Sequence, residues 1–270
     1  MSNTEVNAIL IDAHVHVYDC YDMDQLLDAA VENFNKAAKK LAIGNGFNAV
    51  LLLSETSRDN WFSKSSKTDK YSRWQIEKTP EASVVLAKPK GKNGSDTTIY
   101  IMAGRQIITA EGLELLALIT DGIFDDDLPV ATVLNTVREQ DAIPVLPWAV
   151  GKWLGKRGKV LSNVINKEAG SDLCLGDNSG RPIFWRNPSH FKQAGALHMP
   201  LLPGSDPLPF ASEVKRVGSF GFSLRGRLSA SQPATDLKNL LRTDSAEFQA
   251  YGRLENPWQF FVNQIRVRMV

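Results

Sequence analysis

The first clear pattern in the chain is an apolar, β-branched run near its beginning that turns into an alternation of polar and apolar residues. Residues 8–11 read Ala-Ile-Leu-Ile, and residues 12–17 read Asp-Ala-His-Val-His-Val. A short run of this kind is typical of a buried strand of a parallel sheet. We therefore predict the first strand over residues 8–17.

The next segment has the spacing of an amphipathic helix. Apolar residues recur every three or four positions between residues 26 and 41, and Asp24 stands where a helix cap is expected. Gly44 and Gly46 then end the helical pattern, and residues 48–54 form a second apolar run. The sequence predicts a helix from Asp24 to about residue 41 and a second buried strand over 48–54.

Between about residues 55 and 101 the pattern changes. Polar loop segments are followed by three strand-like runs at 74–78, 83–87 and 97–102, and a turn rich in Gly and Asn at 90–95 joins the last two. Such a turn between two strand-like runs predicts a hairpin. We expect an antiparallel β insertion that covers or flanks the main sheet.

Strands and helices alternate again beyond residue 107. The expected strands are 107–108, 116–120, 142–146, 172–176 and 199–202, and the expected helices are a short one from 110, 130–140, 152–166 and 188–194. Alternation of this kind predicts βα units around a mostly parallel sheet that is closed or nearly closed, an α/β barrel. We expect one domain over residues 1–270, with the insertion at about 55–101 and a C-terminal extension at about 211–270.

Composition narrows the class of protein. The 270 residues carry 31 Lys and Arg against 30 Asp and Glu, a formal net charge of +1. This balance gives no strong field for nucleic acid or a membrane, and no apolar run has the length of a bilayer span. The first residues lack the pattern of a signal peptide, and the two cysteines lie far apart. These features predict a cytoplasmic protein with a small-molecule partner, without nucleic acid or membrane, and leave the oligomeric state open.

The first strand carries the strongest candidate site. Because side chains alternate along a strand, we expect Asp12, His14 and His16 on one face. Burying these groups together is costly unless they bind a metal or pair with one another. The pattern therefore predicts either a metal site at the mouth of the barrel or a hydrogen-bonded structural pair.

A second candidate follows the predicted strand at 199–202. A Gly204-Ser205 turn delivers Asp206 at the end of this strand, where barrels place catalytic groups. An aspartate there can be a metal ligand or a general base for water. The alternative is that Asp206 caps a helix near residues 209–216.

A third candidate is the polar loop after the strand at 172–176. Asp177 is interpreted as a further metal ligand or general base, Asn178 as a hydrogen-bond donor and Arg181 as a clamp for a phosphate or carboxylate. Asp, Asn, Ser and Gly together are equally typical of an ordinary turn. Lys152 is a weaker candidate for an anion pocket, with solvated surface as its alternative. His190 and His198 are left outside the site.

At this point the chain resembles a family, the polymerase and histidinol phosphatase (PHP) superfamily, with the amidohydrolase-like barrels as its relatives. The resemblance rests on Asp12-Ala13-His14-Val15-His16, on residues 103–107 with 111–116, on residues 143–148, and on Gly204-Ser205-Asp206, in family order. It implies an α/β fold, a distorted (β/α)7–8 TIM-like barrel, that holds up to three divalent metals and hydrolyses phosphoesters.

The departures from the family pattern are informative. Where the family has a metal-bridging glutamate, this chain has Gln106, and where it has histidines we find Leu113, Leu146 and Leu208. An uncharged amide is a poor bridging ligand, and leucine cannot bind a metal. A trinuclear site is therefore excluded, and a reduced, mononuclear site remains.

The sequence thus favours a metal-dependent hydrolase of phosphoesters. His14, His16 and Asp206, with Asp177 as a supplement, would hold one Zn²⁺ or Mn²⁺ ion. Asp177 or Asp206 would act as the base, and Arg181 would orient an anionic substrate. The alternative is a barrel without catalysis that binds a small anion through residues 177–182 or serves as a scaffold.

Overall fold

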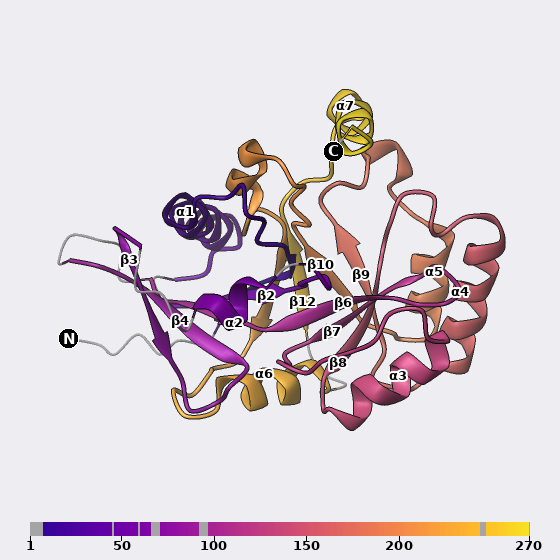
Figure 1. The fold of residues 1–270 in the computed structure, drawn as a ribbon, viewed down its shortest axis with the longest axis horizontal. Helices are drawn as coiled ribbons and strands as arrows, with labels where there is room; N and C mark the ends of the chain where they lie inside the picture. Colours follow the sequence, from indigo (N-terminus) through magenta and orange to yellow (C-terminus); the bar gives the residue numbers. More distant parts are fainter. Residues whose placement is uncertain are drawn as a thin grey trace.

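The strands of the protein form two mixed sheets. The computed structural model describes residues 8–44, 46–58, 60–65, 71–91, 97–243 and 247–269 (Figure 1). In the larger sheet the order is β12 (Phe248–Tyr251), β11 (Gly221–Arg225), β1 (Ala8–Val15), β2 (Asn48–Leu53), β5 (Ile99–Met102), β4 (Val84–Pro89) and β3 (Trp74–Lys78). In the smaller sheet it is β10 (Leu201–Gly204), β9 (Cys174–Asn178), β8 (Ile143–Pro147), β7 (Glu114–Leu118) and β6 (Gly104–Ile108).

Helices cover the outer faces of the two sheets. Figure 1 shows α1 (Met23–Lys40) on one side of the molecule and α3 (Val130–Glu139), α4 (Gly155–Lys167) and α5 (Ser189–Ala196) on the other. The remaining helical elements are α2 (Trp61–Ser65), α6 (Pro233–Leu241), α7 (Pro257–Val267) and the short 3₁₀ turns η1 (Ile183–Trp185) and η2 (Ala211–Arg216). Within the described part of the chain, none of the helices has the length and apolar character to span a bilayer.

Three hydrophobic clusters correspond to these layers. The first packs α1 against the larger sheet, and Phe34 and Leu51 belong to it. The second lies between the two sheets and is closed by α6, with Ile11 and Leu237 among its members. The third packs α3, α4 and α5 against the smaller sheet. The order of layers is therefore helix, sheet, sheet, helix, which is one way for two sheets to bury both of their faces.

The predicted TIM-like barrel is wrong, because the strands do not close into one. β1 pairs with β11 on one edge and with β2 on the other, so neither edge is free for a ladder with β10. An antiparallel hairpin also replaces one of the predicted βα units. The helix expected from residue 110 is instead a tight turn with Gly112 at φ +73° between β6 and β7. With the closed barrel, the likeness to amidohydrolase barrels is lost as well.

Most of the predicted elements are present at shifted bounds. β1, α1, β2, α3 and the β8 to β10 region follow the sequence pattern, and the β3–β4–β5 strands of the insertion are antiparallel as expected. The turn predicted at 90–95 lies largely outside the described residues. Asp22, rather than Asp24, caps α1, since its side chain accepts a hydrogen bond from the amide of Gln25.

The two sheets meet where β10 reaches the end of β1. The amide of Asp206 donates to the carbonyl oxygen of His14 at 2.8 Å. The backbones are so close here that a Cβ atom on Gly204 would collide with the backbone nitrogen of His14. In β1 itself the register shifts between Asp12 and Val15, and Val15 packs against α1 as Leu10 does. Strict alternation from residue 12 to 16 is therefore broken by a bulge.

We predict that Gly204→Ala lowers the free energy of unfolding by about 3 kcal/mol, because the methyl group must push β10 away from β1. Gly195→Ala is the matched control, since nothing lies within 4 Å of a Cβ at this helical position. It should leave stability unchanged or raise it by up to about 1 kcal/mol. Urea denaturation of the two variants measures the difference, and equal effects would contradict the close approach.

Candidate metal centre

Two histidines face each other at the end of β1. The Nε2 atoms of His14 and His16 lie 3.1 Å apart, and both side chains are buried. Their rings are tilted by 53°, so that the edges rather than the faces converge. This arrangement places two imidazole nitrogens at one point, where β1 leaves the larger sheet.

Asp206 completes a group of three possible ligands. Its Oδ1 atom is 3.6 Å from the Nε2 atoms of both His14 and His16. Across the described residues, these three form the one group of His, Cys, Asp or Glu whose donor atoms all lie within 4.8 Å of one another. Ligand atoms of a tetrahedral Zn²⁺ ion stand about 3.3 Å apart when each is about 2.0 Å from the metal. The observed separations fit such an ion.

The electrostatics of the group suit a cation. Burial lowers the pKa of His14 to about 4, while Glu114 and Gln106 act in the opposite direction. The imidazole is therefore neutral at neutral pH and keeps a lone pair for a metal. Burial raises the pKa of Asp206, whereas His16 and Arg216 lower it. A cation between these groups would favour the charged carboxylate.

Asn178 holds the aspartate in place. Its Nδ2 atom donates to Oδ2 of Asp206 at 2.8 Å and to the carbonyl oxygen of Trp148 at 2.7 Å. Because Oδ2 is engaged in this way, Oδ1 is left to face the histidines. The sequence interpretation of Asn178 as a hydrogen-bond donor matches this position. Asp206 also has φ +46°, a strained backbone conformation of the kind that clusters at functional sites.

Asp12 does not join the histidines. Its buried carboxylate accepts hydrogen bonds from the amides of Ser205 at 2.7 Å, Gly218 at 2.8 Å and His14 at 3.3 Å. Burial raises its pKa to about 7, and the bonds from Ser205, Gly218 and His14 act against this shift. Asp12 therefore connects β1 with the segments that follow β10 and η2.

The structure does not bring Asp177 and Arg181 to the histidines. Arg181 donates from Nε and Nη2 to the two oxygens of Asp177, each at 2.7 Å. Its Nη1 atom donates to the carbonyl oxygens of Trp185 and Arg186. Both side chains of the pair are buried, and they are absent from the residues that line the cavity at His14. Their charges are thus engaged with each other.

A cavity of about 370 Å³ opens in front of the histidines. Lys152 and Glu114 form an ion pair in its wall, and Gln106 lines it too. Arg216 also lines it but is held by Glu213 and Glu255. Sequence reasoning missed Glu114 and Arg216. A single acid at the start of the apolar run 115–118 was a signal for Glu114, whereas Arg216 has no comparable signal.

The other two histidines, His190 and His198, lie outside the candidate metal group, and His198 is exposed. His190 in α5 is buried and its Nε2 atom lies 3.0 Å from the carbonyl oxygen of Gly158, so that it serves packing.

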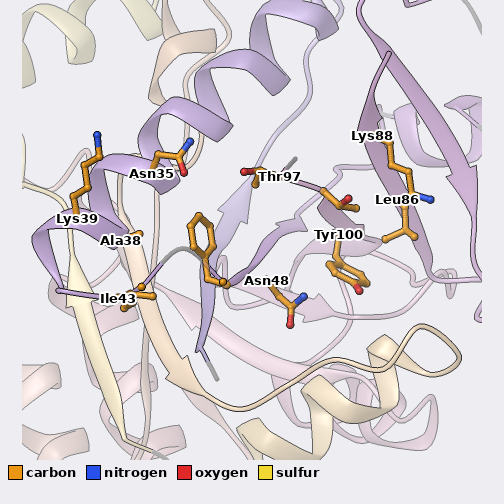
Figure 2. Close-up of a pocket in the computed structure, with 13 residues that line it drawn as sticks. Asn35, Ala38, Lys39, Ile43, Asn48, Leu86, Lys88, Thr97 and Tyr100 are labelled. Atoms are coloured by element: carbon orange, nitrogen blue, oxygen red, sulfur yellow. The ribbon is translucent and has the colours of Figure 1, made fainter. Parts of the chain in front are cut away.

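A second cavity, shown in Figure 2, is lined by α1, β2, β4 and β5 and includes Lys39, Lys88 and Tyr100. It shares no lining residue with the cavity at His14.

Comparison with known proteins shows the fold of the chain. No family model and no curated protein matches the sequence. Among solved structures, PsfC from Pseudomonas syringae matches with a TM-score of 0.54 at 12% identity, over 98% of this chain and 99% of that protein. The lesion-specific endonuclease PfuEndoQ from Pyrococcus furiosus matches with a TM-score of 0.54 at 10% identity, over 89% of this chain. This chain spans 57% of that endonuclease.

These matches correct the prediction that nucleic acid is not a partner. A third similar structure, with a TM-score of 0.50 and 9% identity, is endonuclease Q in complex with a 27-mer duplex substrate that has an abasic lesion at the active site. A protein that shares this fold thus binds duplex DNA. The formal net charge of +1 reports only the sum over the chain, and it is no basis for excluding a nucleic-acid partner.

We predict that Asp12→Ala destabilises the protein by about 3 kcal/mol or more, because three buried N–H groups lose their acceptor. Asp12→Asn should cost less, since its Oδ1 atom still accepts from Ser205 and His14. Chemical denaturation followed by circular dichroism ranks the three proteins. An Ala variant as stable as the Asn variant would show that the carboxylate does not hold the three segments.

Proposed function

We propose that the protein is a metal-dependent hydrolase of phosphoesters with a mononuclear site formed by His14, His16 and Asp206. The observation that carries this proposal is the convergence of two imidazole nitrogens and one carboxylate oxygen on a single point at the wall of a cavity. The resemblance of the Asp-x-His-x-His strand to the PHP superfamily supports the same conclusion.

The donor set favours Zn²⁺ or Mn²⁺. Imidazole nitrogens suit Zn²⁺, and a carboxylate suits either ion. Three protein ligands leave further coordination positions open, as catalytic sites require. A divalent cation held here supplies Lewis-acid chemistry, which polarises a phosphoester and makes water easier to deprotonate.

The side chains around the cavity have distinct parts in this proposal. Asn178 orients Asp206, so that the carboxylate keeps one oxygen toward the histidines. Lys152 presents an ammonium group to an anionic substrate, because it lines the cavity and its ion pair with Glu114 leaves further N–H donors. The carboxylate of Glu114 would act as the general base that accepts a proton from the attacking water. We propose these parts in place of the roles of general base and anion clamp that the sequence predicts for Asp177 and Arg181.

The phosphoester can belong to a small molecule or to DNA. The similarity of the fold to endonuclease Q favours testing phosphodiesters of nucleic acid together with small aryl phosphates. The alternative of a small-anion binder that uses residues 177–182 has less support, because the guanidinium of Arg181 is buried and four of its five N–H groups donate to Asp177, Trp185 and Arg186.

Metal binding is the direct test of the site. Calorimetric titration with Zn²⁺ or Mn²⁺ should show one site per chain, and His14→Ala should remove it. Asn178→Ala should weaken the affinity by about 10- to 100-fold, because Asp206 loses its orienting partner. His198→Ala, an exposed histidine away from the group, is the control and should bind as the parent does. A parent protein that takes up neither ion, or a His14→Ala variant that binds equally well, would rule the proposal out.

A second prediction concerns the substrate. With aryl phosphate or an oligonucleotide as the probe, Lys152→Met should lower kcat/KM by about tenfold or more, because the anion loses a charged hydrogen bond. Zn²⁺ affinity should change far less than turnover, since Lys152 is not a ligand. Unchanged kcat/KM in this variant would remove Lys152 from the substrate site and leave the metal site in place.

A further inference from the structure

The C-terminal helix α7 exposes a continuous apolar stripe. Trp258, Phe261 and Ile265 follow one another at spacings of three and four residues, which places them on one side of α7, and Met269 lies two residues beyond the end of this helix. Their exposed fractions are 77%, 56%, 61% and 73%. Large apolar side chains gathered in this way on a surface indicate an interaction site.

The stripe continues onto η1. The ring of Phe184 stacks on that of Phe261, with the centroids 6.3 Å apart, and contacts Phe260 edge-on at 5.8 Å. Phe184 and its neighbour Ile183 are themselves more than half exposed. We call the exposed side chains of Trp258, Phe261, Ile265 and Met269, together with those of Ile183 and Phe184, the α7 patch.

The α7 patch belongs to a helix that is firmly attached to the protein. Asn256 caps α7 by accepting a hydrogen bond from the amide of Gln259. The preceding residue, Glu255, binds Arg216 through its side chain and Arg181 through its backbone amide. On the inner side of α7, Phe260 packs into the core of the smaller sheet. Figure 1 shows the helix at the periphery of the molecule, so its outer side faces solvent.

The two segments that carry the α7 patch contain basic but no acidic residues. No Asp or Glu occurs between residues 256 and 270, whereas Arg266 and Arg268 lie in this segment. The segment that contains η1 likewise has no acid between residues 178 and 205, and Arg186 there is exposed. Arg268 directly follows α7 and is exposed, whereas the guanidinium of Arg266 lies over the ring of Phe210, 4.0 Å from its centroid. An anionic partner complements such a surface.

The apolar and basic character of the α7 patch argues against two other kinds of binding partner. A symmetric dimer through the α7 patch would bring the patch against itself, so that arginines meet arginines without any acid from these segments. Single-stranded nucleic acid stacks on aromatic rings, but Ile265 and Met269 offer no ring. A bilayer, in contrast, accepts Trp, Phe and aliphatic side chains together, with arginines at the level of the headgroups.

We propose that α7 and η1 bind the surface of an anionic lipid bilayer, with Trp258, Ile265 and Met269 inserted among the lipids and Arg268 against the headgroups. The helix lies on the bilayer and does not cross it. Its opposite side, including Asn263 and Val267, lines the cavity at His14. Binding would therefore hold that cavity close to the lipid surface. The proposal concerns the α7 patch alone and does not depend on the metal or on hydrolysis.

Flotation of the full chain with vesicles tests this proposal. The protein should float with vesicles of phosphatidylcholine mixed with phosphatidylserine and much less with phosphatidylcholine alone. A Trp258→Ser/Ile265→Ser double variant should bind at least about tenfold more weakly. Arg268→Gln should bind about fivefold more weakly, because one cation near the surface is lost. Ile123→Ser is the matched control, since Ile123 is 86% exposed in the loop after β7 and should not matter.

The same samples give the results that would overturn the proposal. Flotation of the parent requires the patch to meet lipid, so failure of the parent to float with anionic vesicles overturns the proposal. Equal flotation of the double variant and the Ile123→Ser control does the same. Sedimentation that shows a dimer broken by the double variant, or duplex DNA bound through the patch without vesicle binding, assigns the patch to another occupant. Metal affinity, measured in parallel, should be unaffected by all three variants.

Discussion

The rest of the site depends on the backbone hydrogen bonds that the carboxylate of Asp12 accepts. This carboxylate accepts backbone hydrogen bonds from His14, from Ser205 and from Gly218, which belong to segments far apart in the sequence. Two of these donors stand at the candidate ligands: one is the amide of His14 itself, and the other directly precedes Asp206. A buried acceptor shared in this way sets the separation of the ligands before any metal is bound.

Surrounding contacts hold Asp206 in a strained backbone conformation. Asp206 adopts φ +46°, yet its amide is bonded to the carbonyl oxygen of His14 and its side chain to Asn178. Each of these partners comes from a different strand, β1 in one case and β9 in the other. The aspartate is thus fixed from two directions, which is the kind of preorganisation that a metal site needs.

The sequence identified the candidate ligands and the hydrogen-bond donor Asn178, but it did not identify Glu114 or Arg216. His14 lies near the end of β1, His16 just beyond it and Asp206 just beyond β10, and the ends of strands are identifiable from apolar runs. Which of Asp177 and Asn178 reaches the candidate ligands depends on which face of β9 points to the cavity. Cys174 packs between the sheets and Leu175 packs against the helices, so alternation puts Asn178 on the cavity side and Asp177 on the helix side. That orientation is a property of the tertiary structure.

The barrel was mispredicted for a related reason. Local patterns identify strands, but they do not say which strands pair, and β11 and β12 belong to residues 211–270, for which the sequence predicts an extension beyond the barrel. Once β11 occupies the edge of β1, β10 can approach only its end. This approach is what brings Asp206 to the histidines, so that the feature that breaks the barrel also builds the candidate site.

Charged side chains connect this site with the surface of α7. Arg216 lines the cavity, lowers the pKa of Asp206 and binds Glu255, the residue that precedes the cap of α7. The backbone of Glu255 in turn bonds with Arg181 and Ile183, which places η1 beside the helix. One arginine thus contributes to the charge of the ligand group and to the position of the exposed apolar helix. A change that displaces Glu255 should therefore affect both the ligand group and α7, because Arg216 links the two.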